Sequence, residues 1–326
     1  MNLTDRPIAE SDLLTCATML ARGLAYPDGI ADHLPGVWRS LMRDEALTGA
    51  VVENSERGTS VTLSFGISVF VTDRWAEAAR IGRTPYLTAR TIRTELSGDS
   101  PILRSPGIAR ANGGAGLEVI ILHYCEASDL PADLTHAARL KMLASFIDSH
   151  RGYRIKGILQ EFWDEIDPEF VLNGWGRVLT DYAAYFRERG EALPPLGRRP
   201  HLVGLSRKDT LAHPGNPMAS VFVFTPPLCK FSRAEQKLLR FALTGKTDVE
   251  LASSLGLSLP TIKSRWRSIH LRAARALPSV LPPDCPDIDS GHRGREKRRR
   301  LLYYLRSHPE ELRPMNRRKA RDEAGP

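Results

Sequence analysis

Hydrophobic and polar residues follow two different spacings in the first two thirds of the chain. Apolar residues recur every three or four positions, as on one face of a helix, in three segments: 8–24, 134–149 and 170–187. They recur at every second position, as in strands, in three others: 60–71, 117–124 and 219–224. Helical and strand-like segments interleave with irregular spacing, so we predict an α+β domain over residues 1–225.

The pattern becomes purely helical between the proline-rich breaks at 225–227 and 281–286, which predicts a separate domain over 228–280. Two pairs of residues have the three-residue spacing of a capping box and open two helices: Ser232 with Glu235, and Thr247 with Glu250. Gly245 and Gly256 can take the positive φ values that end a helix. Ser258 then caps a third, longer helix with Pro260 in its first turn.

The third helix has one apolar and one basic face. Its inward stripe is formed by Ile262, Trp266, Ile269 and Ala273. The opposite face presents Thr261, Lys263, Ser264, Arg265, Arg267 and Arg272. A short helix, a glycine turn and a longer helix with a basic outer face are typical of the helix-turn-helix, which places its second helix in the major groove of DNA.

The segment resembles the LuxR/GerE-type helix-turn-helix and, nearly as well, region 4 of sigma factors. The resemblance is carried by Ser232, Glu235, Leu239, Gly245, Glu250-Leu251-Ala252, Leu255, Ser258, Thr261-Ile262-Lys263 and Ile269. It implies that Thr261, Lys263, Arg265 and Arg267 lie at the DNA-facing start of the recognition helix. Together with Ser258, Ser264 and Arg272, these are the predicted DNA-binding residues.

Two features depart from the LuxR pattern. Ser264-Arg265 is closer to the sigma version, because the LuxR type usually has a histidine at the position of Arg265. Pro278, Pro282 and Pro283 leave little room for the fourth helix through which the LuxR type dimerises. The sequence therefore leaves open whether the protein forms a homodimer.

Charge is distributed unevenly along the 326 residues, whose formal net charge is +8. Residues 1–227 hold 24 Lys and Arg against 27 Asp and Glu, whereas 228–280 hold 10 against 3 and 291–321 hold 12 against 3. A basic C-terminal third is typical of proteins that bind a polyanion. The tail at 281–326 has two interpretations: a clamp for DNA phosphates, or a solvated end with one packed turn around Leu301, Leu302 and Leu305.

Composition excludes several other classes of protein. Apolar runs such as 117–122 are too short to span a bilayer, and the N-terminus lacks the pattern of a secretory signal. Cys16, Cys125, Cys229 and Cys285 are scattered without a CxxC pair, which favours reduced thiols in the cytoplasm over disulfides or structural zinc.

The first domain offers weak candidates for chemistry. The glycine-rich 112–116 precedes a strand, so a turn is favoured over a phosphate loop. His123 and Cys125 share one face of a strand, where packing is favoured over metal binding. The acidic run 164–169 favours a helix N-terminus over a metal or acid–base site. Nearby aromatic residues either pack in the core or line a small-molecule pocket: Phe162, Trp163, Phe170, Trp175, Tyr182, Tyr185 and Phe186. We therefore expect no catalytic residue, metal or cofactor.

Residues 64–79 resemble the central strands of GNAT acyltransferases. The acyl-CoA diphosphate loop of that family, Arg/Gln-x-x-Gly-x-Gly/Ala between a strand and a helix, is missing after residues 117–124.

The sequence favours a DNA-binding transcription regulator that is not an enzyme. Its α+β domain would sense a small-molecule ligand or a partner, and its helix-turn-helix would bind double-stranded DNA. One alternative is a GNAT-like acyltransferase that uses the helix-turn-helix only for localisation. The second is a sigma-like factor that recruits RNA polymerase, which would need a further helix pair upstream.

Overall fold

The computed structural model describes residues 2–21, 29–56, 59–82, 84–162, 176–195, 199–213, 215–282 and 293–316. The chain divides into two compact units, Met1–Val223 and Phe224–Pro326, called here the first and the second unit. Among the described helices, none is both long and apolar enough to cross a membrane.

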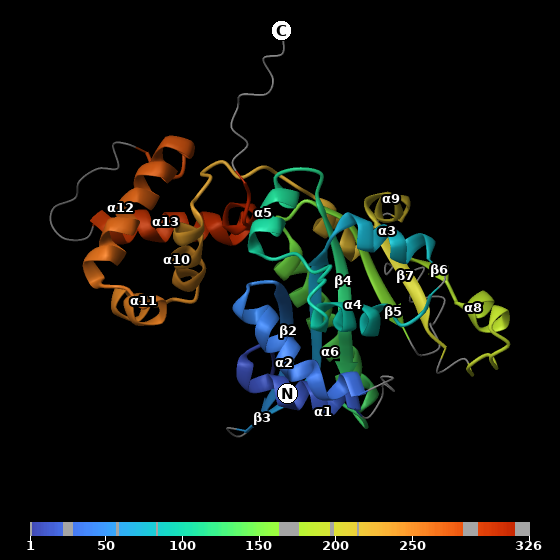
Figure 1. Ribbon diagram of the computed structural model, residues 1–326. Coiled ribbons are helices and arrows are strands. Elements are labelled where there is room, and N and C mark those ends of the chain that lie inside the picture. Colours follow the sequence, from blue (N-terminus) through green and yellow to red (C-terminus); the bar gives the residue numbers. More distant parts are fainter. Residues whose placement is uncertain are drawn as a thin grey trace, which may run out of the picture. The chain divides into compact units, whose positions relative to one another are not determined.

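The described residues of the first unit form a seven-stranded sheet in the order β1-β2-β3-β4-β5-β7-β6 (Figure 1). The strands are β1 Leu3–Pro7, β2 Leu47–Glu56, β3 Thr59–Val71, β4 Leu117–Glu126, β5 Ile155–Phe162, β6 Arg177–Thr180 and β7 His201–Ser206. β4 and β5 run parallel, and the other neighbouring strands are antiparallel. The expected mixture of helices and strands in this part of the chain is confirmed.

Helices cover both faces of the sheet, each over its own apolar core. The helices on one face are α1 Leu13–Ala21, α2 Ile30–Arg43, α3 Asp73–Ile81 and α4 Leu87–Leu96. Their buried side chains, among them Trp38 and Ile92, pack on Phe65 and Ile67 of β3. On the other face, α5 Ser105–Asn112, α6 Ala132–His150 and the 3-10 helix η5 Pro217–Phe222 contribute to cores with strand residues such as Val119.

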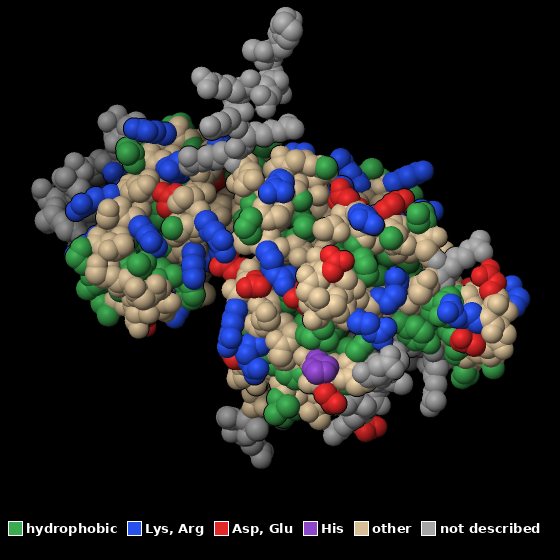
Figure 2. Space-filling view, in the orientation of Figure 1, with side chains coloured by type: hydrophobic (Ala, Val, Ile, Leu, Met, Phe, Trp, Pro, Cys, Tyr) green, Lys and Arg blue, Asp and Glu red, His purple; other side chains and the backbone are tan. Residues whose placement is uncertain are grey.

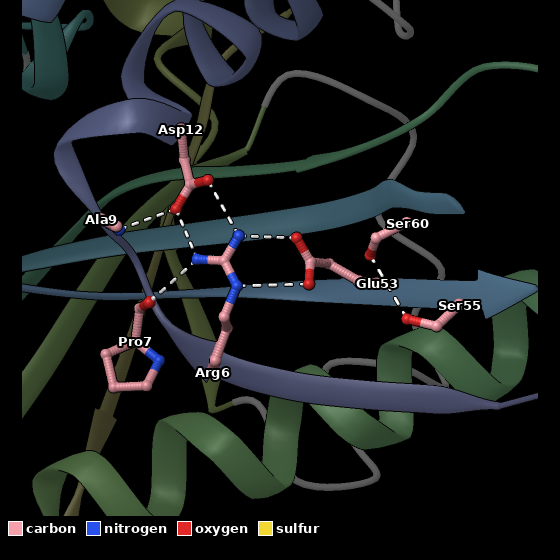
Figure 3. A network of polar contacts seen from close by, with 7 residues as sticks. All are labelled: Arg6, Pro7, Ala9, Asp12, Glu53, Ser55 and Ser60. Atoms are coloured by element: carbon pink, nitrogen blue, oxygen red, sulfur yellow. Dashed lines mark hydrogen bonds and ion pairs between the residues drawn. The ribbon is translucent and has the colours of Figure 1, made fainter. Parts of the chain in front are cut away.

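The N-terminal strand is held to its neighbours by a charged network around Arg6 (Figure 3). Its guanidinium donates to Asp12, in the 3-10 helix η1 Glu10–Asp12, with a shortest distance of 2.6 Å. It also donates to Glu53 on β2 at 2.6 Å. These hydrogen bonds from Arg6 lower the pKa of Asp12, because they stabilise the ionised carboxylate. Arg6 therefore joins three elements of the first unit.

Two predicted elements are wrong. Residues 219–224 were predicted as a strand, but η5 forms there because Asn216 caps it and Pro217 starts it, with Met218, Val221 and Phe222 facing inward. The helix predicted over 170–187 falls partly outside the described residues. Its described part holds β6 and the short helix α8, Ala183–Glu188, instead.

The second unit consists of helices. They are α10 Arg233–Leu243, α11 Asp248–Leu255, α12 Leu259–Ala276, α13 Arg293–Ser307 and the 3-10 helix η6 Pro309–Leu312. The capping boxes predicted at Ser232 and Thr247 are both present, Gly256 has a φ of 62°, and Ser258 caps α12. The predicted inward stripe of α12 is fully or nearly fully buried.

The segment predicted as a solvated or clamping tail is largely part of this helical core. Leu301, Leu305 and Leu312 are buried beside Leu238, Ile262 and the other core residues of α10–α12. The buried Glu311 carboxylate accepts hydrogen bonds from the backbone N–H groups of Leu228, at 2.8 Å, and Cys229, at 3.0 Å. Residues 293–316 therefore complete the second unit, and the expectation of a separate tail is corrected for this segment.

Candidate functional site

The parallel strands β4 and β5 separate near their carboxyl ends. Their last paired residues are Ile121 and Gln160, although β4 continues to Glu126 and β5 to Phe162. At the same point β4 contains a bulge. Ser68 of β3 pairs with Ile121 and Ile67 pairs with His123, so Leu122 between them is the extra residue of β4. Bulges redirect side chains and are frequent beside active sites, and ligands of open α/β sheets bind outside the carboxyl ends of the strands.

Glu161 lies on β5 directly after this separation. Its side chain is buried, and its Oε1 accepts a hydrogen bond from the backbone N–H of Tyr86 at 2.7 Å, at the start of α4. Its Oε2 has no hydrogen-bond partner among the described residues. Burial raises the pKa of Glu161 to about 7, against the opposing effects of the N–H groups of α4 and the charge of Arg90. The carboxyl is thus poised to gain or lose a proton near neutral pH.

Other polar groups are buried in the same region. The hydroxyl of Tyr182 is buried, has no hydrogen-bond partner in the described structure, and its pKa is raised by burial and by the charge of Glu161. Thr88 of α4 donates to the carbonyl oxygen of Leu122 in the bulge at 3.1 Å. The first turn of α4 and the residue before it therefore form hydrogen bonds to both separated strands.

His123 of the bulge does not form the metal site considered from sequence. Its ring packs edge-on against Trp38, with centroids 5.2 Å apart, and burial lowers its pKa to about 3, so it is neutral. Within the described ranges, no group of three or more His, Cys, Asp or Glu residues is arranged to hold a metal ion. The favoured interpretation, a packed histidine, agrees with this geometry.

The remaining candidates of the first unit have structural roles or lie outside the described residues. Asn112 accepts a hydrogen bond from the N–H of Arg154 at 2.8 Å, and Gly113–Ala115 form a turn before β4, as favoured from sequence. Tyr182 and Phe186 pack in the apolar core. The acidic run 164–169 lies outside the described residues, and so do Trp163, Phe170 and Trp175.

The loop between β4 and α6, residues 127–131, is the place where the resemblance of residues 64–79 to GNAT acyltransferases leads us to expect a diphosphate loop. It contains no glycine, and Asp129 has a φ of 63°. Pro131, which offers no N–H, precedes α6, and Asp133 adds a carboxylate to the first turn of that helix. A diphosphate needs backbone N–H donors and positive charge, so these residues do not fit it.

The predicted DNA-binding residues divide into two groups on α12. Ser258, Lys263, Ser264 and Arg267 are exposed, and Thr261 and Arg265 are half-buried. The side chain of Arg272 is half-buried, with Nε 3.4 Å from the Glu235 carboxylate of α10. Because it is paired with this acid, its charge is less available to a partner than the charges of Lys263 and Arg267.

The acidic side chains of the second unit form hydrogen bonds and ion pairs within that unit. Its described residues hold 18 Lys and Arg against six Asp and Glu. Each of the six acids has a protein partner: Glu235 with Ser268, Asp248 with Arg298, Glu250 with Thr247, Glu296 with Arg299, Glu310 with His308, and Glu311 with Cys229. Figure 2 shows Lys and Arg side chains over the visible face of this unit. The exposed charge is therefore positive.

No family model and no curated protein matches the chain. Several solved structures are similar to it at low identity. A mutant of spermidine N-acetyltransferase SpeG from Vibrio cholerae is 12% identical over 64% of this chain and 96% of its own, with a TM-score of 0.34. A mutant of the toxin AtaT, bound to the C-terminus of the antitoxin AtaR and to acetyl-CoA, is 11% identical over 65% of this chain and 99% of its own, with a TM-score of 0.24.

Two expectations are not retained. The similar structures include acetyltransferases of spermidine and give no support to the expectation that the protein is not an enzyme, or to its description as a LuxR-type transcription regulator. The likeness concerns the fold alone, so the substrate and the chemistry have to be argued from the residues of this chain.

Proposed function

We propose that the protein is an enzyme of the acyltransferase class whose first unit uses Glu161 as a general base. The observation that carries this proposal is the buried Glu161 carboxyl, with one oxygen unpartnered, at the point where β4 and β5 separate. A general base works best when its pKa is close to the operating pH, and the pKa of Glu161 is about 7.

The chemistry proposed for this carboxylate is transfer of an activated acyl group to an amine. The amine nitrogen attacks the acyl carbonyl carbon, its proton passes to Oε2 of Glu161, and the bond from the carbonyl carbon to the leaving group breaks. The leaving group then takes up a proton. Because residues 127–131 do not fit a diphosphate, we propose an activated acyl compound as the donor and do not assign acyl-CoA.

The test is an acyl-transfer assay on the full-length protein. Acetyl-CoA and an acetyl thioester of N-acetylcysteamine, which lacks the nucleotide, are offered with an amine panel that includes spermidine, and thiol release is measured. We expect turnover that increases as the pH rises through about 7, and a loss of about 10²- to 10⁴-fold in Glu161→Gln.

Glu53→Gln is the matched control, because it also removes one carboxylate but belongs to the Arg6 network. Its rate should stay close to that of the parent. Absence of thiol release with every donor and acceptor, or equal losses in both variants, would contradict the proposal.

A second function, localisation on double-stranded DNA, is favoured by the outer face of α12. The side chains of Lys263 and Arg267 are exposed, and no ion pair engages them among the described residues. Guanidinium and ammonium groups on a helix can bind guanine edges and phosphates in the major groove. We propose that Ser258, Thr261, Lys263, Ser264, Arg265 and Arg267 form this DNA-binding surface, in the manner of the helix-turn-helix that the sequence resembles.

Selection of the full-length protein against a random duplex pool tests this second function. We expect an enriched motif that disappears in Lys263→Ala/Arg267→Ala. It should persist in the charge-matched Arg43→Ala/Arg74→Ala, whose exposed arginines lie on α2 and α3. A pool without enrichment would contradict sequence-specific docking by α12.

A further inference from the structure

A second basic surface lies on the side of α13 that points away from the leucine core. Arg299, Arg300 and Arg306 are exposed, and Tyr303 between them is 75% exposed. Leu301 and Leu305, on the opposite side, are buried. Arg299, Tyr303 and Arg306 follow one another at intervals of four and three positions and so share one face of the helix, and Arg300, three positions before Tyr303, lies at the edge of that face. This set of three arginines and one tyrosine is called the α13 face below.

The α13 face keeps a positive charge despite a nearby acid. Glu296 pairs with Arg299 at 2.8 Å and with Arg300 at 2.9 Å, so one carboxylate is shared by two guanidinium groups. These hydrogen bonds lower the pKa of Glu296 to about 2. The side chain of Arg306 has no ion pair in the described part of the chain.

Contacts at the start of α13 hold this face in place. Arg298 pairs with Asp248 of α11 at 2.8 Å and donates to the carbonyl oxygen of Lys246 at 2.7 Å. Its guanidinium also lies over the Trp266 ring of α12, 4.7 Å from the centroid. With Leu301 and Leu305 in the core, α13 presents its arginines from a fixed backbone, which limits the entropy lost on binding.

Positive charges of α13 and α12 are neighbours. His270 of α12 stacks on Trp266. Burial lowers the pKa of His270 to about 4, and the positive charges of Lys297 and Arg298 contribute to this shift. The start of α13 therefore places positive charge beside His270 of α12.

We propose that the α13 face binds the phosphate backbone of duplex DNA without reading its sequence. Guanidinium forks match phosphate oxygens, and the Tyr303 hydroxyl can donate a further hydrogen bond. This inference rests on the proposed docking of α12 on DNA and adds a second group of contacts to it. Each phosphate contact releases counterions, so these residues contribute to the salt dependence of binding more than to its specificity.

The experiment measures binding of the full-length protein to a duplex of scrambled sequence by fluorescence anisotropy over a series of salt concentrations. In Arg300→Gln/Arg306→Gln, the slope of log K against log salt should become shallower by about 1.8, since each lost phosphate contact contributes about 0.9. Glu296→Gln should strengthen binding, because it releases Arg299 and Arg300 from their acidic partner.

Arg43→Gln/Arg74→Gln on the first unit is the charge-matched control, and circular dichroism checks that every variant keeps its helices. An unchanged slope in the α13 variant, or an equal change in the control, overturns the inference. If the parent binds and only Lys263→Ala/Arg267→Ala weakens binding, the α13 face is wrong and docking by α12 stands. If the parent does not bind duplex DNA at all, both proposals fall.

Discussion

The two units use their arginines in opposite ways. In the first unit, arginines join elements through acids: Arg6 bridges Asp12 and Glu53, Arg80 pairs with Glu118, and Arg104 pairs with Glu95. In the second unit, the acids contact helix ends, the backbone of the core and a few arginines, while Lys263, Arg267 and Arg306 keep exposed charges. Net charge alone would not separate these roles. The contacts of the acidic side chains therefore decide which Lys and Arg side chains remain available to a partner.

Deleting residues 293–326 is the most drastic test of the second unit. The deletion removes Leu301, Leu305 and Leu312 from the core and Glu311 from the N–H groups of Leu228 and Cys229. Since each large core side chain contributes about 2–5 kcal/mol, we expect α10–α12 to unfold while the first unit stays folded. Circular dichroism and limited proteolysis follow the loss, and deletion of 317–326 alone serves as the control. Intact helices α10–α12 after the longer deletion would show that α13 is not required.

The first unit should lose stability as the pH rises from about 5 to 8. The pKa of Glu161 is about 7 in the folded protein against 4.5 for an ordinary glutamate, so the folded state binds its proton more tightly. The contribution is complete below about 4.5 and is lost as the pH rises through 7, and it amounts to about 3 kcal/mol. Thermal unfolding at several pH values measures this contribution to the free energy of unfolding. Glu161→Gln should flatten the pH dependence, and an unchanged profile in that variant would assign the effect to other groups.

Removing one arginine from each unit addresses the comparison directly. Arg6→Gln leaves the mostly buried Asp12 and Glu53 without their donor, so we expect the free energy of unfolding to fall by about 1–3 kcal/mol. Arg267→Gln removes an exposed side chain, and its effect should stay within about 0.5 kcal/mol. Denaturant titration measures the free energy of unfolding of both variants and of the parent. Similar costs at the two positions would mean that the contrast between the units is not energetic.

A smaller loss of stability than that of Arg6→Gln is expected at the start of α12. The Ser258 hydroxyl accepts a hydrogen bond from the N–H of Thr261 at 3.3 Å, so Ser258→Ala should destabilise the second unit by about 1 kcal/mol. The same change should weaken DNA binding further if α12 docks as proposed. Comparing urea midpoints with affinities separates the two roles, and Ser258→Asn, which retains a capping oxygen, should restore stability.

Local signals explain which elements were predictable. The boxes at Ser232 and Thr247, the cap at Ser258 and the apolar stripe of α12 are each encoded within a few residues, and the structure contains all of them. At 219–224, alternating apolar residues indicated a strand, although Asn216 and Pro217 already carried the signal for a helix start.

Tertiary neighbours explain what could not be predicted. Glu161 becomes a candidate base only because the sheet order brings β5 beside the start of α4, which lies far away in sequence. The ion pair of Arg272 could not be predicted because its partner, Glu235, lies on another helix. Similarly, the leucines of 301–312 could be recognised as apolar, but the core that buries them is formed by α10–α12.

The bonds from Glu311 to Leu228 and Cys229 also have a mechanical consequence. They tie the entry of the second unit to its exit, and Gln236 adds hydrogen bonds to the carbonyl oxygens of Glu311 and Arg313. Tension applied to the chain on either side of this unit would load these bonds before it reached the helices. We therefore expect that a segment fastened at its own ends in this way keeps its fold when it is excised or inserted into another chain.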